Sequence, residues 1–137
     1  RIGYKPGEPR LVRMDYQAAD GREIFLAFED EQRTLFGLLR LRIQDKPISR
    51  LGQSNGNTAL VRELHVYGSE VPLKGQDPAA AQHKGLGKAL LAEAERIARE
   101  EFKAEQMAVL SGVGAREYYQ LEADYRLHAD YMVKNLV

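Results

Sequence analysis

The sequence predicts an α+β fold in which a mixed, mostly antiparallel sheet carries a long helix after its fourth strand. Four successive segments alternate apolar and polar side chains or are rich in β-forming residues. An amphipathic helix pattern follows them, and a short apolar strand follows the helix. The first four strands are expected over Leu11 to Tyr16, Glu23 to Glu29, Leu35 to Ile43 and Ala59 to Tyr67.

Three polar segments separate these strands and indicate hairpin order. Ala19 to Arg22 contains Asp-Gly, which is a strong hairpin signal. Glu29 to Arg33 and Gly52 to Asn57 have the composition of a turn and a loop. The four strands should therefore form a meander.

The segment Gln82-His83-Lys84-Gly85-Leu86-Gly87-Lys88 opens the long helix. A Gln-x-x-Gly-x-Gly pattern at this point presents unpaired backbone N–H groups at the positive end of the helix dipole, and its glycines let a ligand approach the main chain closely. The pattern predicts a cradle for a diphosphate, although a loop that needs only glycine flexibility would carry it too. Apolar residues then recur at spacings of three and four, at Leu86, Leu90, Ala94, Ile97, Ala98 and Phe102.

The last part of the chain should complete the sheet. Met107 to Leu110 is expected to form a strand, and Ala115 to Leu121 a short helix. Tyr125 to His128 and Tyr131 to Val133 are expected to form the closing strands. No internal repeat or linker interrupts residues 1–137, which indicates one domain.

Composition excludes several classes of site. The chain has no cysteine, so it cannot hold a disulfide, a thiolate metal site or an iron–sulfur cluster of its own. The His, Asp and Glu spacings resemble no metal site. No apolar run approaches membrane-spanning length, and Arg1 to Gly7 carry no signal-peptide pattern. We therefore expect a cytoplasmic protein without membrane contact.

The charge balance argues against a stand-alone nucleic-acid binder. Twenty basic and twenty acidic residues give a net charge of zero, whereas such binders usually carry a basic excess. A local basic cluster consists of Arg40, Arg42, Lys46 and Arg50. A solvated strand edge and loop explains this cluster better than an RNA contact does.

The order of strand, loop, Gln-x-x-Gly-x-Gly and helix is typical of the GNAT N-acetyltransferases. Within that fold, the chain resembles the acetyltransferase domain of the Elongator catalytic subunit, a radical S-adenosylmethionine enzyme that carboxymethylates the wobble uridine of tRNA. The specific string Glu-Leu-His-Val-Tyr-Gly-Ser carries most of the resemblance. The matching segments are Val61 to Ser69, Gln82 to Gly85, Glu93 to Glu101, Ser111 to Tyr119 and Tyr131 to Lys134, with weaker similarity from Gly37 to Arg42 back to about Val12.

The resemblance implies the reaction and its partners. The domain would bind acetyl-CoA and release the acetyl unit for carboxymethylation of the uridine at C5. S-adenosylmethionine and an iron–sulfur cluster would be bound outside this chain, which is expected to be the acetyltransferase portion, residues 1–137, of a larger radical enzyme. That other domain would supply most of the contact with tRNA. Other Elongator-type subunits or a second copy of the chain are further candidate partners.

One GNAT feature is missing. Members of that fold usually carry two helices between their first and second strands, and these helices form a wall on the acceptor side of the active site. Only the tight turn Ala19 to Arg22 separates the corresponding strands here. The wall must therefore come from another domain, another subunit or the acceptor itself.

The resemblance also implies the residues that contact acetyl-CoA. Backbone groups of Glu63, Leu64, His65 and Val66 would lie along the pantetheine arm, where an N–H can polarise the thioester carbonyl. Tyr119 would contact the cofactor and protonate the departing thiolate, whereas the adjacent Tyr118 would point elsewhere on its helix. From residue type alone, both tyrosines could equally be core aromatics. The diphosphate would lie on Gln82, His83, Lys84, Gly85, Leu86, Gly87 and Lys88.

Two residues of the fourth strand are candidates for a general base. Glu63 and His65 alternate onto the same face, where they could accept a proton through a water. A structural hydrogen-bonded pair is an equally good explanation. Glu117 is a weaker candidate base.

Two other functions remain open. A free-standing N-acetyltransferase acting on a protein lysine or a small amine would need a general base and an acceptor wall. A non-catalytic acetyl-CoA-binding module would need neither. The segment after Tyr119 departs from the Elongator pattern, because Gln120 to Asp124 is one residue longer and lacks the family's glycine. Ala129 and Asp130 likewise stand where that family has Gly-Pro.

Overall fold

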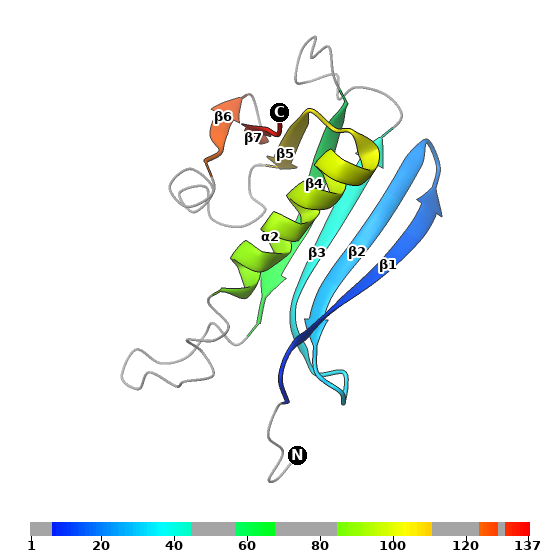
Figure 1. Cartoon of the computed structure of the whole chain (residues 1–137), viewed down its shortest axis with the longest axis vertical. Helices are drawn as coiled ribbons and strands as arrows, with labels where there is room; N and C mark the ends of the chain where they lie inside the picture. The colour runs from blue at the N-terminus through cyan, green and yellow to red at the C-terminus, as the bar shows by residue number, and fades with distance from the viewer. Residues whose placement is uncertain (1–6, 45–56, 68–84, 111–123, 129–130) are drawn as a thin grey trace.

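A seven-stranded sheet with a helix packed on one face forms the body of the molecule (Figure 1). The computed structural model describes residues 7–44, 57–67, 85–110, 124–128 and 131–137. The helix is α2 (Leu86–Arg96), which continues as the π-helical turn η2 (Ile97–Glu101). The strands are β1 (Arg10–Ala18), β2 (Gly21–Glu29), β3 (Leu35–Gln44), β4 (Thr58–Val66), β5 (Gln106–Leu110), β6 (Arg126–His128) and β7 (Tyr131–Asn135).

The order of the strands confirms the predicted fold. The sheet runs β1-β2-β3-β4-β5-β7-β6, and every neighbouring pair is antiparallel except β4 and β5, which are parallel. α2 follows the fourth strand, as predicted, and only residues 19 and 20 separate β1 from β2. The short helix expected over Ala115 to Leu121 lies outside the described residues. In the described ranges, no helix combines the length and the apolar character that a bilayer crossing needs.

The first hairpin uses its Asp-Gly pair in an unexpected way. Asp20, not the glycine, takes the left-handed conformation of the turn, with φ of 63°. Gly21 is already part of β2, where an added Cβ would lie 2.2 Å from the carbonyl oxygen of Ile43 in β3. The glycine is therefore required by the close approach of two strands, because any side chain there would collide with backbone.

The main core lies between α2 and the sheet. Alternate side chains of the central strands point toward the helix, and its apolar stripe covers them. Each large aliphatic side chain buried in this layer contributes about 1.5–3 kcal/mol, so the layer supplies most of the stability. Its fully buried members include Ile24, Leu26, Leu39, Leu41, Val61, Leu90, Ile97, Met107, Val109 and Met132.

A chain of ion pairs connects the end of the helix to the edge strand β1. Arg13 donates hydrogen bonds to both carboxylate oxygens of Glu101, each at 2.7 Å, and to Asp15 at 2.8 and 3.0 Å. Arg96 donates to Glu93 at 2.8 Å and to Glu101 at 3.4 Å. The bonds from Arg13 hold the pKa of Glu101 and that of Asp15 below their ordinary values.

A second polar contact holds the closing hairpin against the helix. The Tyr125 hydroxyl donates to Glu95 Oε2 at 2.8 Å, and Lys134 Nζ donates to Glu95 Oε1 at 3.1 Å. Tyr125 itself is buried. The preceding Asp124 has φ of 62°, so an aspartate adopts here the left-handed conformation that a glycine favours.

Glu101→Gln should lower the free energy of unfolding at pH 7 by about 0.2–1 kcal/mol, since solvent screens a pair that is partly exposed. The pKa of Glu101 is lowered in the folded state, so its contribution is complete above the ordinary value of 4.5 and is lost as the pH falls through the lowered value. The difference between mutant and wild type should therefore shrink at low pH. Urea denaturation of both proteins at pH 7 and at about pH 3 measures this difference. The lower pH lies about one unit below the ordinary pKa of a glutamate.

Glu105→Gln is the control, because the described residues give the Glu105 side chain no ion pair. It should change stability little at either pH. A Glu101→Gln effect that stays constant with pH would show that the pair with Arg13 does not contribute through its charge.

Candidate functional site

The pairing of β4 with β5 stops before β4 ends. The last paired residues are Val61 and Val109, whereas β4 continues to Val66. From Glu63 to Val66, β4 is paired with β3 on one edge, and no described strand pairs with its other edge. A ligand that lies along this edge at Glu63 to His65 would meet backbone N–H and C=O groups that no described strand pairs.

A β-bulge decides which way the side chains of this segment point. Arg40 is opposite Glu63, but Leu41 is opposite Val61, so Arg62 is the extra residue in β4. Before the bulge, Val61 points into the main core. After it, Leu64 packs against that core, and Glu63 points to the opposite face. Without the bulge, strict alternation would place Glu63 on the helix side with Val61.

Glu63 and His65 share the open face of the sheet, as the alternation predicts. His65 Nε2 lies 3.7 Å from Glu63 Oε2, and Arg40 Nη1 lies 3.4 Å from Glu63 Oε1. The His65 ring also stacks on Tyr67, with 6.2 Å between ring centroids. The imidazole is more than half exposed, so a substrate or a water can reach it.

The start of α2 has the features of an anion cradle. Gly85 is the N-cap, with no side-chain cap hydrogen bond, and the first turn has no acidic residue. An added Cβ at Gly85 would meet nothing within 4 Å, so the space in front of the main chain is open. The helix dipole favours negative charge at this point. These residues therefore fit a diphosphate.

The two glycines of the motif differ in their surroundings. Gly85 borders open space, whereas Gly87 is buried in the helix. Leu86 is half-buried and Lys88 is exposed. Only Gly85 therefore leaves room for a ligand. Gln82, His83 and Lys84 lie outside the described residues, as do Glu117, Tyr118 and Tyr119.

A close contact brings the helix start and the open part of β4 together. An added Cβ at Gly37 of β3 would lie 3.2 Å from the carbonyl oxygen of His65 and 3.3 Å from Leu90 Cδ1. The absence of a side chain at Gly37 thus lets α2 pack tightly beside the end of β4. Figure 1 shows the start of α2 and the end of β4 at the same end of the sheet.

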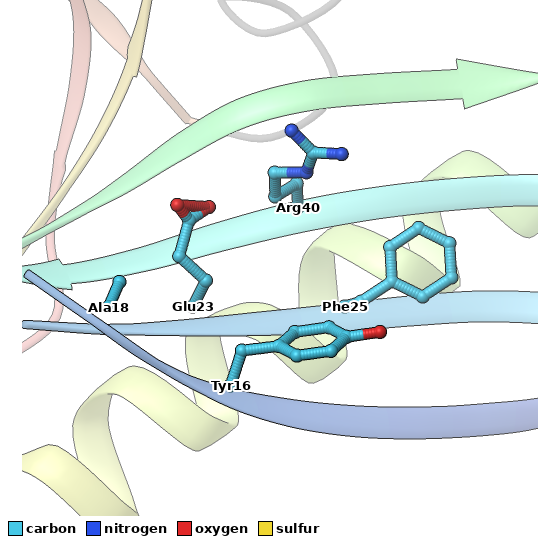
Figure 2. Close-up of a pocket in the computed structure, with 5 residues that line it drawn as sticks. All are labelled: Tyr16, Ala18, Glu23, Phe25 and Arg40. Atoms are coloured by element: carbon cyan, nitrogen blue, oxygen red, sulfur yellow. The ribbon is translucent and has the colours of Figure 1, made fainter.

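The structure also reveals a hollow that sequence reasoning did not single out. It has a volume of about 410 Å³ and lies on the sheet face opposite α2 (Figure 2). Its residues come from three strands, so no local motif announces it. They are Tyr16, Ala18, Glu23, Phe25 and Arg40.

The basic cluster of the sequence is partly neutralised. Arg40 pairs with Glu63, and Arg42 lies 3.5 Å from Glu23. Lys46 and Arg50 lie outside the described residues. Within the described ranges, no group of three His, Asp or Glu side chains could hold a metal ion.

Comparison with known proteins gives a family and several relatives. Residues 3–123 match the acetyltransferase (GNAT) family. The chain is 57% identical over 137 residues to a tRNA uridine(34) acetyltransferase of Dehalococcoides mccartyi, covering 99% of this chain and 30% of that protein. It is 50% identical over 133 residues to the human Elongator complex protein 3, covering 96% of this chain and 24% of that protein.

A solved structure agrees with these relatives. The archaeal Elp3 of Methanocaldococcus infernus, with an N-terminal deletion, superposes with a TM-score of 0.80 at 43% identity. The match covers 98% of this chain and 32% of the archaeal one. The chain thus spans less than a third of the length of each of these three relatives.

Proposed function

We propose that this chain, which belongs to the acetyltransferase (GNAT) family, is the acetyl-CoA-binding domain of an Elongator-type enzyme. That enzyme would modify a uridine of tRNA. One observation carries the proposal: the end of β4, beyond the last residue paired with β5, lies at the same end of the sheet as the helix start at Gly85, where the space in front of the main chain is open. The printed names of the relatives, a tRNA uridine(34) acetyltransferase and Elongator complex protein 3, supply the substrate class.

The finer reaction is part of the same proposal. The product would be a wobble uridine carboxymethylated at C5, as the resemblance to the Elongator catalytic subunit implies. S-adenosylmethionine and an iron–sulfur cluster would belong to another domain of a longer protein, because residues 1–137 contain no cysteine. Most of the contact with tRNA would also lie in that domain.

The chain's own residues divide the binding of acetyl-CoA between two elements. Backbone N–H groups from Gln82 to Lys88 would hold the diphosphate, with Gly85 leaving the space that the phosphates need. Backbone groups from Glu63 to Val66 would bind the pantetheine arm along the edge of β4 that lies beyond its pairing with β5. When bound, acetyl-CoA supplies an acetyl unit activated as a thioester.

We assign proton transfer to side chains of this chain. We place Tyr119 as the acid that protonates the departing thiolate, and Tyr118 as its neighbour without that role. His65 and Glu63 would accept a proton through a water, with His65 the better exposed of the two. Arg40 neutralises the Glu63 carboxylate, so the imidazole is the more available acceptor.

Gly85→Glu should abolish acetyl-CoA binding, because it fills the open space at the helix start with bulk and negative charge. The fold should survive, since an added Cβ there meets no protein atom within 4 Å. Isothermal titration calorimetry with acetyl-CoA measures the loss, and circular dichroism checks the fold.

Gly85→Ala is the matched control. Its backbone φ of −82° suits any residue, so the variant should fold and bind acetyl-CoA with a smaller loss than Gly85→Glu. Unchanged affinity for acetyl-CoA in a folded Gly85→Glu protein would show that the diphosphate does not bind at this helix start.

Tyr119→Phe should leave acetyl-CoA binding nearly intact and slow thioester cleavage on the order of a hundredfold or more, because only the proton source is lost. The assay uses the full-length protein with tRNA and follows the release of coenzyme A. Tyr118→Phe, which removes the neighbouring hydroxyl, should cleave at nearly the wild-type rate. Near-wild-type cleavage by both variants would leave water or backbone groups as the acid.

The chain alone should bind tRNA weakly at near-physiological salt. Its net charge is zero, and Arg40 and Arg42 are already paired with carboxylates, so few counterions would be released. Filter binding over a range of salt concentrations measures the affinity. Tight binding with a steep salt dependence would show that the cluster from Arg40 to Arg50 contacts phosphates.

A further inference from the structure

We propose that the hollow formed by Tyr16, Ala18, Glu23, Phe25 and Arg40 binds a base of the RNA substrate. The inference rests on the proposed function and adds a site to it. Figure 2 shows the five side chains on one face of strands β1, β2 and β3, with the helix behind the sheet. No residue of this hollow belongs to the acetyl-CoA site described above.

Two aromatic rings give the hollow a surface for stacking. Tyr16 of β1 lines the hollow and is 49% exposed, and Phe25 of β2 is half-buried. In the register of β1 and β2, Tyr16 is opposite Glu23 and Met14 is opposite Phe25, so the two rings are diagonal neighbours. Nucleobases stack on such rings whatever their sequence, because every base has a π-face.

Glu23 supplies a hydrogen-bond acceptor that the described residues leave unused. Its Oε2 atom lies 3.2 Å from Arg62 and 3.5 Å from Arg42. Its Oε1 atom is buried and has no hydrogen-bond partner among the described residues. A buried acceptor without a donor is costly, so a ligand that brings an N–H group gains an unusually favourable contact.

A ligand can reach this oxygen only if a neighbouring side chain moves. Arg62, which contacts the other oxygen of Glu23, is 50% exposed, so it can swing aside with little loss of packing. A flat ring stacked on Tyr16 would then keep the Glu23 oxygen shielded from water. The N–H edge of that ring then takes the place of the missing donor.

The surrounding charge selects a nucleobase over an amine. An aromatic pair beside a carboxylate would also suit an ammonium group. Here, however, Arg40, Arg42 and Arg62 lie around two carboxylates, Glu23 and Glu63, so these described groups leave one positive charge in excess. This small excess disfavours a cation and accepts a neutral base.

Arg40 connects the hollow to the proposed reaction. Its side chain lines the hollow, and its guanidinium also pairs with Glu63, which contacts His65. A guanidinium has five N–H donors, so Arg40 can bind a ring carbonyl and keep its contact with Glu63. A base in the hollow would therefore lie next to the segment Glu63 to Val66, where the acetyl group is expected.

The test uses the full-length protein and a short single-stranded oligouridine that carries one 4-thiouridine. Photocrosslinking followed by mass spectrometry should map the modified base to peptides that contain Tyr16 or Phe25. Tyr16→Ala should weaken binding of the same oligonucleotide by about fivefold to a hundredfold, which is the range for loss of one stacked base. Tyr16→Phe keeps the π-face and should bind nearly as well as wild type.

Leu127→Ala is the matched control, because Leu127 is similarly exposed at 45% but lies on β6, at the far edge of the sheet. It should not change binding. Crosslinks that all lie elsewhere, together with unchanged affinity of Tyr16→Ala, would overturn the proposal. Protection of Tyr16 from hydroxyl-radical labelling without RNA would also overturn it, because another polypeptide segment would then cover the hollow.

Calorimetry with acetyl-CoA separates this inference from the proposed function. If wild-type protein binds acetyl-CoA but gives no crosslink in the hollow, only the base site is ruled out. If it crosslinks through the hollow but does not bind acetyl-CoA, the proposed function is ruled out and the base site is kept.

Discussion

The extra residue in β4 at Arg62 is the constraint on which the arrangement of the site depends. A strand that pairs without interruption alternates its side chains strictly between two faces. Ala59 and Val61 obey this rule and fill the core beneath α2. The bulge then reverses the alternation, so that Glu63 turns outward and Leu64 turns inward. One residue of register thus lets a strand that fills the core also present a carboxylate and an imidazole on the opposite face of the sheet.

The same part of β4 also extends beyond its pairing with β5. Its parallel partner β5 stays in register only as far as Val109, so no described strand pairs with that edge of β4 beyond Val61. A free strand edge is normally a liability, because it can pair with another chain. Here Gly37 lets α2 pack closely against the end of β4, and the helix start at Gly85 lies at the same end of the sheet. An extended ligand with a polar arm and an anionic end could therefore use the edge and the helix dipole together.

Periodicity predicted the parts of the structure that depend on local sequence. Seven strands and the long helix were expected within a few residues of where they lie, because each buries one face and its pattern shows that face. The shared face of Glu63 and His65 followed from alternation alone. Which face it would be could not be predicted, because the bulge at Arg62 depends on pairing with β3.

Other features depend on contacts between distant segments. Arg40 and Arg42 were grouped as a solvated basic cluster, but their partners Glu63 and Glu23 come from other strands. The hollow was missed for the same reason, since its residues meet only after three strands pair. Gly21 was expected to form the turn, yet Asp20 takes the left-handed conformation and Gly21 makes room for Ile43. Tight local geometry of this kind follows from tertiary packing, which a pattern of residue types does not contain.

The two faces of the sheet differ in what they contribute. The helix-facing side is a continuous aliphatic layer, in which each large side chain contributes about 1.5–3 kcal/mol. The opposite face carries half-exposed Met14 and Tyr16, together with a buried carboxylate oxygen of Glu23 that finds no donor among the described residues, at a cost of about 1–3 kcal/mol. The same face also holds a small apolar cluster over β4, β5 and β7, where Ala108 and Val133 are buried and Leu60 and Tyr131 pack against them. The larger apolar layer is on the helix side, and the part of the opposite face over β1 to β3 keeps polar and aromatic groups.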